Sequence, residues 1–194
     1  GGRTFYIMDE GSRVSILLPS HWSFIARDAF NGVVLWKKPI AQWHSQLWPL
    51  KSGPTQLTRR LVAVNESVYV TLSINAPVSR LDAVSGEVVR VYESTKGTEE
   101  ILVVGNVLYA LINPDPWVLN EFAPKFNTGD QKRVETEFNW DGKPRELQAV
   151  DLASCRVLWR RQGKIAPLTV AADAQRVVYY DGDRLVCLDP SQGE

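Results

Sequence analysis

The amino-acid sequence predicts an all-β protein built from a repeated unit. Residues 26–36 (ARDAFNGVVLW) are echoed by residues 149–159 (AVDLASCRVLW), with the same Ala-x-Asp opening and the same Val-Leu-Trp end. Short apolar stretches rich in Val, Ile, Leu and Tyr recur between turn-forming residues, and almost no segment shows a sustained helical period. Repeats of this kind fix an architecture before any residue-level chemistry is considered.

The first phrase of the repeat is Asp-x-x-x-Gly between two apolar stretches, which indicates a strand, a tight turn and a second strand. Its copies are Asp28 to Gly32, Asp82 to Gly86, Asp189 to Gly193, and Asp151 with Cys155 at the glycine position. An Asp that opens a turn accepts hydrogen bonds from the backbone N–H groups of the turn, so these residues are predicted to be structural. Because Cys155 replaces glycine, we expect the third turn to be less tight.

The second phrase alternates with the first and also predicts a hairpin. Its copies are residues 60–72 (RLVAVNESVYVTL), 100–112 (EILVVGNVLYALI) and 168–180 (LTVAADAQRVVYY), and residues 4–8 (TFYIM) match its second half. The two phrases together give units of four antiparallel strands, A to D, at residues 1–40, 59–94, 99–162 and 165–194. The first unit lacks strand A, and the last stops where strand D should begin.

Four-stranded units recurring about every 40–50 residues predict a β-propeller, in which neighbouring blades cover each other's apolar faces. The chain is therefore expected to be a single partial propeller of about four blades. A β-sandwich is the alternative fold, but it does not explain the repeated Asp-to-Trp phrase.

The phrase ARDAFNGVVLW resembles the Ala-x-Asp-x-x-x-Gly-x-x-x-Trp pattern of PQQ-like, or quinoprotein-type, propeller repeats. The resemblance covers nearly the whole chain and implies that it is part of a larger propeller. It also implies that Trp36 and Trp159 dock against the next blade, whereas Arg90 stands at this position in the second copy. Many proteins of this family resemble assembly factors of the bacterial envelope, which implies a periplasmic or cell-envelope location.

The spacing of the repeats locates three insertions, at residues 9–22, 41–58 and 113–145. All three are B–C or D–A connections, which antiparallel strands place on the same face of a propeller. Loops on a rigid scaffold often carry function. The candidate binding face consists of His21, Trp22, Trp43, His44, Trp48, Lys51, Trp117 and Trp140. The alternative is that these tryptophans bury a small core beneath the loops.

Composition and motifs narrow the function. Lys plus Arg and Asp plus Glu are both 22, so the basic excess typical of a nucleic-acid binder is missing. No apolar run approaches the roughly 18 residues of a membrane-spanning helix. Two histidines and two cysteines form no known metal or nucleophile motif. No cofactor is expected; PQQ with calcium is the alternative that the resemblance implies, although the adjacent cysteines of the quinone dehydrogenases are missing.

The favoured interpretation is a non-catalytic binding or assembly scaffold. A fragment of a PQQ-dependent oxidoreductase and a carbohydrate-binding propeller are the alternatives. The open blade edges predict a protein partner or self-association, including two chains closing head to tail into an eight-bladed ring. A deformed half-ring whose edges are capped by other contacts is the alternative to that ring.

Overall fold

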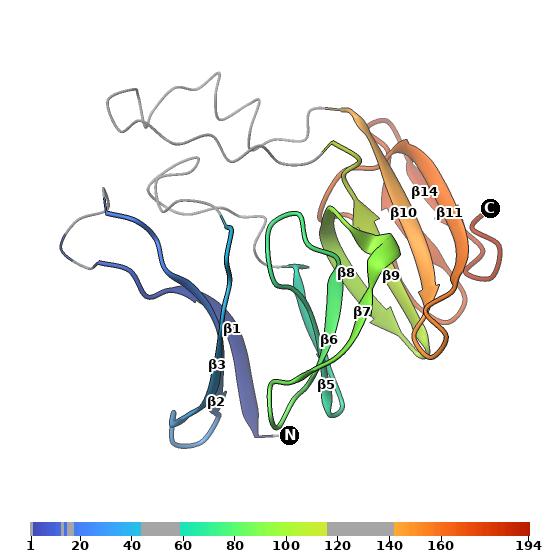
Figure 1. Cartoon of the computed structure of the whole chain (residues 1–194). Helices are drawn as coiled ribbons and strands as arrows, with labels where there is room; N and C mark the ends of the chain where they lie inside the picture. The colour runs from blue at the N-terminus through green and yellow to red at the C-terminus, as the bar shows by residue number, and fades with distance from the viewer. Residues whose placement is uncertain (1, 13, 15–17, 44–58, 116–141) are drawn as a thin grey trace.

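The computed structural model describes residues 2–12, 14, 18–43, 59–115 and 142–194 (Figure 1). Its strands form four antiparallel sheets, which we call blades 1 to 4 in chain order. Blade 1 contains β1 (Arg3–Asp9), β2 (Trp22–Asp28) and β3 (Val34–Pro39). Blade 2 contains β4 (Leu61–Val64), β5 (Ser67–Thr71), β6 (Val78–Asp82) and β7 (Val88–Tyr92), and a short 3₁₀ helix, η2 (Glu93–Thr95), follows it.

Blade 3 contains β8 (Thr98–Val104), β9 (Val107–Ile112), β10 (Pro144–Asp151) and β11 (Val157–Lys164). Blade 4 contains β12 (Ala171–Ala172), β13 (Val177–Tyr180) and β14 (Leu185–Leu188). The strands of every sheet lie in chain order, so each blade is a simple meander. The all-β prediction is confirmed, and so are the three-stranded first and last blades of a partial propeller that does not close.

Three hydrophobic clusters hold the blades together. Blades 1 and 2 share a cluster that includes Phe24, Val68 and Leu81. Blades 2 and 3 share a second cluster around Tyr69 and Leu108, and blades 3 and 4 share a third around Tyr109 and Val177. Successive sheets therefore stack face to face in chain order, as Figure 1 shows. Strand side chains alternate between the two faces of a sheet, so blades 2 and 3 each contribute residues to one cluster on either face.

A β-bulge recurs in the C–D hairpin of the first three blades, just before the turn aspartate. It lies between Ala26 and Arg27 in blade 1, between Arg80 and Leu81 in blade 2, and between Ala149 and Val150 in blade 3. A bulge raises the local twist and re-aims the strand. The repeated bulge therefore gives the three turns a common direction.

Counting the repeats from the tyrosine of each strand B treats Tyr6, Tyr69, Tyr109 and Tyr179 as one repeat position, and the strand register corrects this for two of them. Tyr69 and Tyr109 lie opposite Arg80 and Ala149, each of which is two residues before the turn aspartate of its blade, Asp82 or Asp151. In blade 1 the residue opposite Ala26 is Phe5 rather than Tyr6. In blade 4 the equivalent position is held by Val178, and Tyr179 faces the opposite way, into the cluster shared with blade 3. A one-residue shift moves a side chain to the other face of a sheet, so Tyr6 and Tyr179 are not equivalent to Tyr69.

Candidate functional site

The turn aspartates bind the backbone of their own turns. Asp28 Oδ1 accepts hydrogen bonds from the N–H groups of Phe30 and Asn31 at 2.9 and 3.0 Å. Asp82 Oδ1 accepts them from Val84 and Ser85 in the same way. In blade 3, Asp151 Oδ1 accepts from the backbone N–H and the hydroxyl of Ser154, both at 2.7 Å. The Asp189 carboxylate accepts from the N–H of Ser191 at 2.7 Å. These contacts give the aspartates a structural task.

Hydrogen bonds also set the charge of these carboxylates. The N–H of Ser85 is the main cause that lowers the pKa of Asp82 below its usual range. The hydroxyls of Ser154 and Ser191 are the main causes that lower the pKa of Asp151 and Asp189. The three groups stay ionised and bound to their turns, and none has the raised pKa that a general acid needs at neutral pH.

One residue of the outer strand reaches across each junction to the same backbone atom of the next blade. The indole N–H of Trp36 donates to the carbonyl oxygen of Ala83 at 3.2 Å, and that of Trp159 donates to Pro190 at 2.7 Å. Both acceptors directly follow the turn aspartate of the next blade. Arg90 Nη1 donates at 3.2 Å to Leu152, which follows Asp151, and it also donates to Ala153. The junction between blades 2 and 3 is thus made by an arginine side chain in place of a tryptophan.

The residue at the fourth position after the aspartate matches the side chain that docks on it. A Cβ atom added to Gly86 would lie 2.6 Å from the ring of Trp36, and one added to Gly193 would lie 2.6 Å from the ring of Trp159. Arg90 instead docks beside the turn that carries Cys155. The docked indole rings require glycine because they leave no space for a Cβ atom.

Cys155 does not loosen its turn, which corrects the prediction made from the sequence. Its φ is +60°, close to the +74° of Gly86, and its N–H donates to the carbonyl oxygen of Asp151 at 2.9 Å. Gly32 and Gly86 make the same bond to Asp28 and Asp82 at 2.9 Å. The left-handed backbone conformation costs a residue with a side chain about 1 kcal/mol, and the turn still closes.

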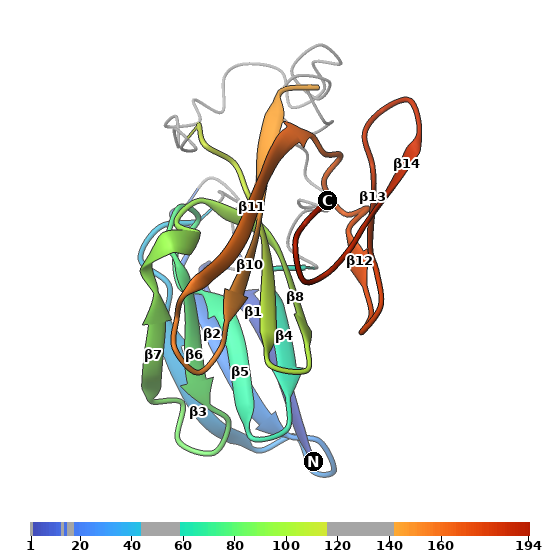
Figure 2. The same ribbon diagram turned by 90° about the vertical axis from the view of Figure 1, so that its right-hand side faces the viewer.

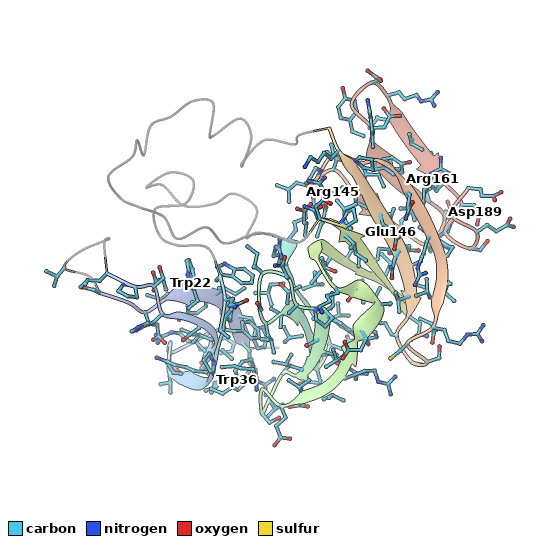
Figure 3. The ribbon with its side chains drawn as sticks, turned by 45° about the horizontal axis from the view of Figure 1, so that its top comes forward. Trp22, Trp36, Arg145, Glu146, Arg161 and Asp189 are labelled. Atoms are coloured by element: carbon cyan, nitrogen blue, oxygen red, sulfur yellow. The ribbon has the colours of Figure 1, made fainter. Side chains whose placement is uncertain are left out.

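Of the described residues of the predicted binding face, the two tryptophans pack into the protein. Trp43 is 6% exposed in the cluster between blades 1 and 2, and Trp22, on β2, packs against the same cluster (Figure 3). His21 is exposed, and its backbone N–H donates to Asp9 Oδ1 at 2.7 Å. Trp22 and Trp43 thus have the placement of the alternative interpretation, in which loop tryptophans form a core. His44, Trp48, Lys51, Trp117 and Trp140 lie outside the described residues.

The strand ends that lead into the three insertions do share one face. Asp9 pairs with Trp22, Ser23 pairs with Pro39, and Ile112 pairs with Glu146, so these ends lie at the same end of their sheets. Figure 1 shows the end of β1 and the start of β10 on one side of the molecule, opposite the N-terminus. We call this side the loop face.

A buried arginine lies under the loop face beside Trp43. Arg60 is 1% exposed, its guanidinium lies 5.6 Å from the Trp43 ring centroid, and its Nη1 donates to the carbonyl oxygen of Ile74 at 2.7 Å. Burial lowers the pKa of Arg60 to about 10, and Glu99 opposes that change. The guanidinium therefore stays charged at neutral pH and is held by a carbonyl and an aromatic face.

Two ion pairs with buried carboxylates join three blades at the same end, one fully buried and one whose arginine is 40% exposed. Glu99 Oε2 lies 2.8 Å from Arg145 Nε, and both side chains are 5% exposed or less. Glu100 Oε1 lies 2.5 Å from Arg59 Nη1, and the Glu100 side chain is fully buried. The other oxygen of Glu100 accepts from the N–H of Leu168 at 2.7 Å, and Arg59 donates to Val170. The pairs link the start of blade 2 to β8 and β10 of blade 3 and to the segment before β12.

Sequence reasoning missed this charge network. Arg59 and Arg60 precede strand A of blade 2, and Glu99 and Glu100 open strand A of blade 3. The sequence does carry a signal for it: two adjacent charged residues stand where each of these apolar strands begins, which breaks the alternation of apolar and polar residues. Burial raises the pKa of Glu100 to about 7, and Arg59 partly opposes this effect.

The two ends of the blade stack differ in polarity. The outward face of blade 4 carries Val178, Tyr180, Leu185 and Cys187, and Leu185 is 74% exposed. The outward face of blade 1 carries Tyr6 and Arg27, whose side chains are hydrogen-bonded at 2.5 Å, and Thr4. Blade 4 thus ends in an apolar face and blade 1 in a partly polar one.

The described part of the chain contains no group of side chains arranged as a metal site. There, no three His, Cys, Asp or Glu side chains come together in a group that could hold a metal ion. No described helix is long and apolar enough to cross a membrane.

Comparison with known proteins supports the fold. No protein-family profile and no curated protein sequence matches the chain. Among solved structures, an acylaminoacyl peptidase from Pyrococcus horikoshii is 9% identical with a TM-score of 0.52, over 97% of this chain and 30% of its own. A europium-containing methanol dehydrogenase is 14% identical with a TM-score of 0.48, over 84% of this chain and 23% of its own. The chain thus spans less than a third of each of these structures, and at 9% identity the likeness to the peptidase concerns the fold alone.

Proposed function

We propose that the chain is a non-catalytic propeller module that serves as a binding or assembly scaffold and joins other protein through its open blade ends. The observation that supports this function is the apolar outward face of blade 4. Tyr180 and Leu185 are 38% and 74% exposed there. Exposed apolar patches on soluble proteins commonly mark interaction sites.

Equivalent positions in the inner blades indicate what this face is built for. Val178 of blade 4 corresponds to Tyr69 and Tyr109, which are 4% and 2% exposed because the next blade covers them. Burying such a face is favourable by about 25 cal/mol for each Å² of apolar area removed from water. The outward face of blade 4 therefore suits a protein surface of blade-like, apolar character.

The edge of blade 4 is also shaped for an added strand. Gly193 N–H donates to Asp189 at 2.8 Å, and Asp189 N–H donates to Glu194 at 2.7 Å. Asp82 makes the same pair of bonds with Gly86 and Glu87, after which β7 begins. The last turn thus holds the geometry that precedes an outer strand in blade 2.

Closure of two chains into an eight-bladed ring is the other form of this proposal. It requires the apolar outward face of blade 4 to pack on the outward face of blade 1. A periplasmic or cell-envelope location belongs to the same proposal and rests on the repeat resemblance. The PQQ-dependent and carbohydrate-binding alternatives gain no specific observation from the described residues.

Sedimentation velocity in the presence of a thiol reductant tests the scaffold proposal. The wild-type chain should self-associate as its concentration rises, and Leu185→Asp should restore the monomer. Leu35→Asp is the matched control, since Leu35 is 44% exposed on the outward face of blade 1. If both variants block association, the ring form is supported; if only Leu185→Asp does, the blade 4 face acts alone. A wild-type chain that stays monomeric at its highest soluble concentration contradicts the proposal.

A further inference from the structure

Among the residues that the structure describes, blade 1 has an unpaired inner edge. Within the described part of the chain β1 pairs with β2 alone, whereas β4 and β8 cover the same edge of β5 and β9. The carbonyl oxygen of Gly2 accepts a hydrogen bond from Ala29, so the Gly2 peptide points toward β2. Peptide groups alternate in direction along an antiparallel strand, which puts those of Arg3, Phe5 and Ile7 on the free edge.

A groove of about 580 Å³ runs beside this edge. It is lined by β1 from Arg3 to Ile7 and by Leu61 and Ala63 of β4, strands of the successive blades 1 and 2 (Figure 2). Phe5, Ile7 and Leu61 also pack against the hydrophobic cluster between blades 1 and 2. The groove is therefore a continuation of the existing blade interface.

One end of the groove is marked by a charge pair. Arg3 Nη1 lies 3.3 Å from Glu66 Oε2, which joins the start of β1 to the turn between β4 and β5. The pair is partly exposed and contributes little to stability. It positions one boundary of the groove, and the free edge extends from there to Ile7.

The inner strands of blades 2 and 3 show what such a groove accepts. Val62 and Leu102 lie opposite Tyr69 and Tyr109 and pack against the next blade. Two residues further along, Val64 and Val104 do the same. The equivalent of Tyr69 in blade 1 is Phe5. By analogy with β4 and β8, a strand that pairs with β1 would carry an aliphatic side chain opposite Phe5 and a second one two residues further along.

We propose that the β1 edge and its groove bind an extended segment of a partner protein as a fourth strand. The segment runs antiparallel to β1, bonds to the peptide groups of Arg3, Phe5 and Ile7, and places two aliphatic side chains toward Leu61 and Ala63. The proposal rests on the scaffold function and names strand addition as its mode of binding. The polar pair Tyr6–Arg27 lies on the other face of blade 1, so an added strand needs only the edge and the groove.

The direct test uses a fluorescent synthetic peptide of residues 60–66, RLVAVNE, the chain's own inner strand, titrated against the whole chain. Saturable binding is expected. A peptide with Asp at both positions corresponding to Val62 and Val64 should not bind. Ala63→Arg, at an exposed position of β4, should weaken the affinity at least about tenfold by filling the groove. Its matched control is Ala171→Arg, at an exposed position of the inner strand of blade 4, which should leave the affinity unchanged.

Amide hydrogen exchange gives a second readout on the wild-type chain. The bound peptide should slow exchange at the N–H groups of Arg3, Phe5 and Ile7, and should leave Thr4 and Tyr6, which face β2, unaffected. Equal binding by the Asp peptide, an unchanged affinity in Ala63→Arg, or the lack of saturable binding overturns the proposal. A chain dimer that the peptide dissociates would assign the groove to a second copy and overturn the partner assignment.

This result is independent of the sedimentation experiment. Leu185→Asp alters the outward face of blade 4 and leaves the β1 groove intact, and Ala63→Arg does the reverse. If the chain self-associates through blade 4 but binds no peptide, strand addition fails while the scaffold function stands.

Discussion

At the scale of single residues, the blade junctions depend on a match between two positions that are far apart in the sequence. Trp36 lies over Gly86 and Trp159 lies over Gly193, whereas Arg90 docks beside Cys155. All three donors reach the carbonyl oxygen of the residue after a turn aspartate. The fourth turn residue is therefore constrained by the side chain that covers it as well as by its own φ.

A matched pair of substitutions separates these two constraints. Gly86→Ala should destabilise the protein by about 3 kcal/mol, because it combines left-handed strain with a clash against the Trp36 ring. Gly32→Ala should cost only about 1 kcal/mol, since Gly32 has a similar φ of +73° but no atom within 4 Å of an added Cβ. Urea unfolding of both variants measures the difference. Equal losses would show that the backbone angle alone selects glycine.

A double-mutant cycle tests the match at the junction of blades 2 and 3. Arg90→Trp should destabilise the chain, because the indole would meet the Cβ atom of Cys155. Adding Cys155→Gly should recover most of that loss and give a favourable coupling energy of about 1–3 kcal/mol. Chemical unfolding of the four proteins provides the cycle, and additive effects of the two substitutions would contradict the match.

At the scale of elements, the alternation of apolar residues specifies where the strands lie, and charged residues at a strand start join neighbouring blades. Strand A of blade 3 opens with Glu99 and Glu100, whose buried carboxylates bind Arg145 and Arg59. Glu100 also accepts a hydrogen bond from Leu168, in the segment that leads to β12. Breaking a buried pair by removing one partner typically costs about 3–5 kcal/mol. The inner strand thus joins its blade to the blades on both sides.

The raised pKa of Glu100 predicts a pH dependence of stability. Burial raises its pKa from 4.5 to about 7, so the folded chain binds this proton more tightly than the unfolded chain does. The contribution of Glu100 to stability is therefore largest at low pH and falls as the pH rises through about 4.5 to 7. In Glu100→Gln this decline should be missing, so the stability difference between variant and wild type should shift in favour of the variant by up to about 3 kcal/mol as the pH rises through this range, whatever its value at low pH.

Urea unfolding of wild type and Glu100→Gln at about pH 5 and about pH 8 measures this change. Glu87→Gln, at an exposed position in the turn before β7, is the control and should keep the wild-type pH dependence. A parallel pH dependence of wild type and Glu100→Gln would mean that Glu100 does not cause the decline.

At the scale of the whole molecule, the blades are unequally covered. Blades 2 and 3 pack on both sides through the three hydrophobic clusters, whereas blade 4 has one apolar face open and an inner strand of only two residues. Blade 1 ends in a face partly closed by Tyr6 and Arg27. Stability is therefore expected to fall from the middle of the stack toward its ends, as in other linear arrays.

Native-state hydrogen exchange tests this gradient. The amides of β5 and β9 should exchange most slowly, because their strands are buried between neighbours. Those of β13 and β14 should exchange fastest among the strands, through opening of blade 4 alone. Equal protection in all four blades would indicate one cooperative unit and contradict the gradient.

The sequence by itself determined the order of strands, the position of the turns and, among the described residues, the three-stranded sheets of the first and last blades. These features are local: alternating apolar residues specify strands, and Asp-x-x-x-Gly specifies a turn whose hydrogen bonds lie within a few residues. It could not fix the faces of Tyr6 and Tyr179, because a strand's register depends on its partner strand. The sequence also predicted a looser turn at Cys155, although this turn closes with the same hydrogen bond to its aspartate as the turns that carry glycine.

Only the tertiary structure decided which residues meet across the blades. Trp43 lies in the core, Arg90 makes the junction contact in place of a tryptophan, and the buried carboxylates of two glutamates near a strand start pair with arginines. Each of these contacts joins residues far apart in the chain, and its energy depends on burial and on distances set by the stacking of sheets. For that reason the repeat identified the scaffold, and the packing of the blades located the uncovered face, the free edge and the groove.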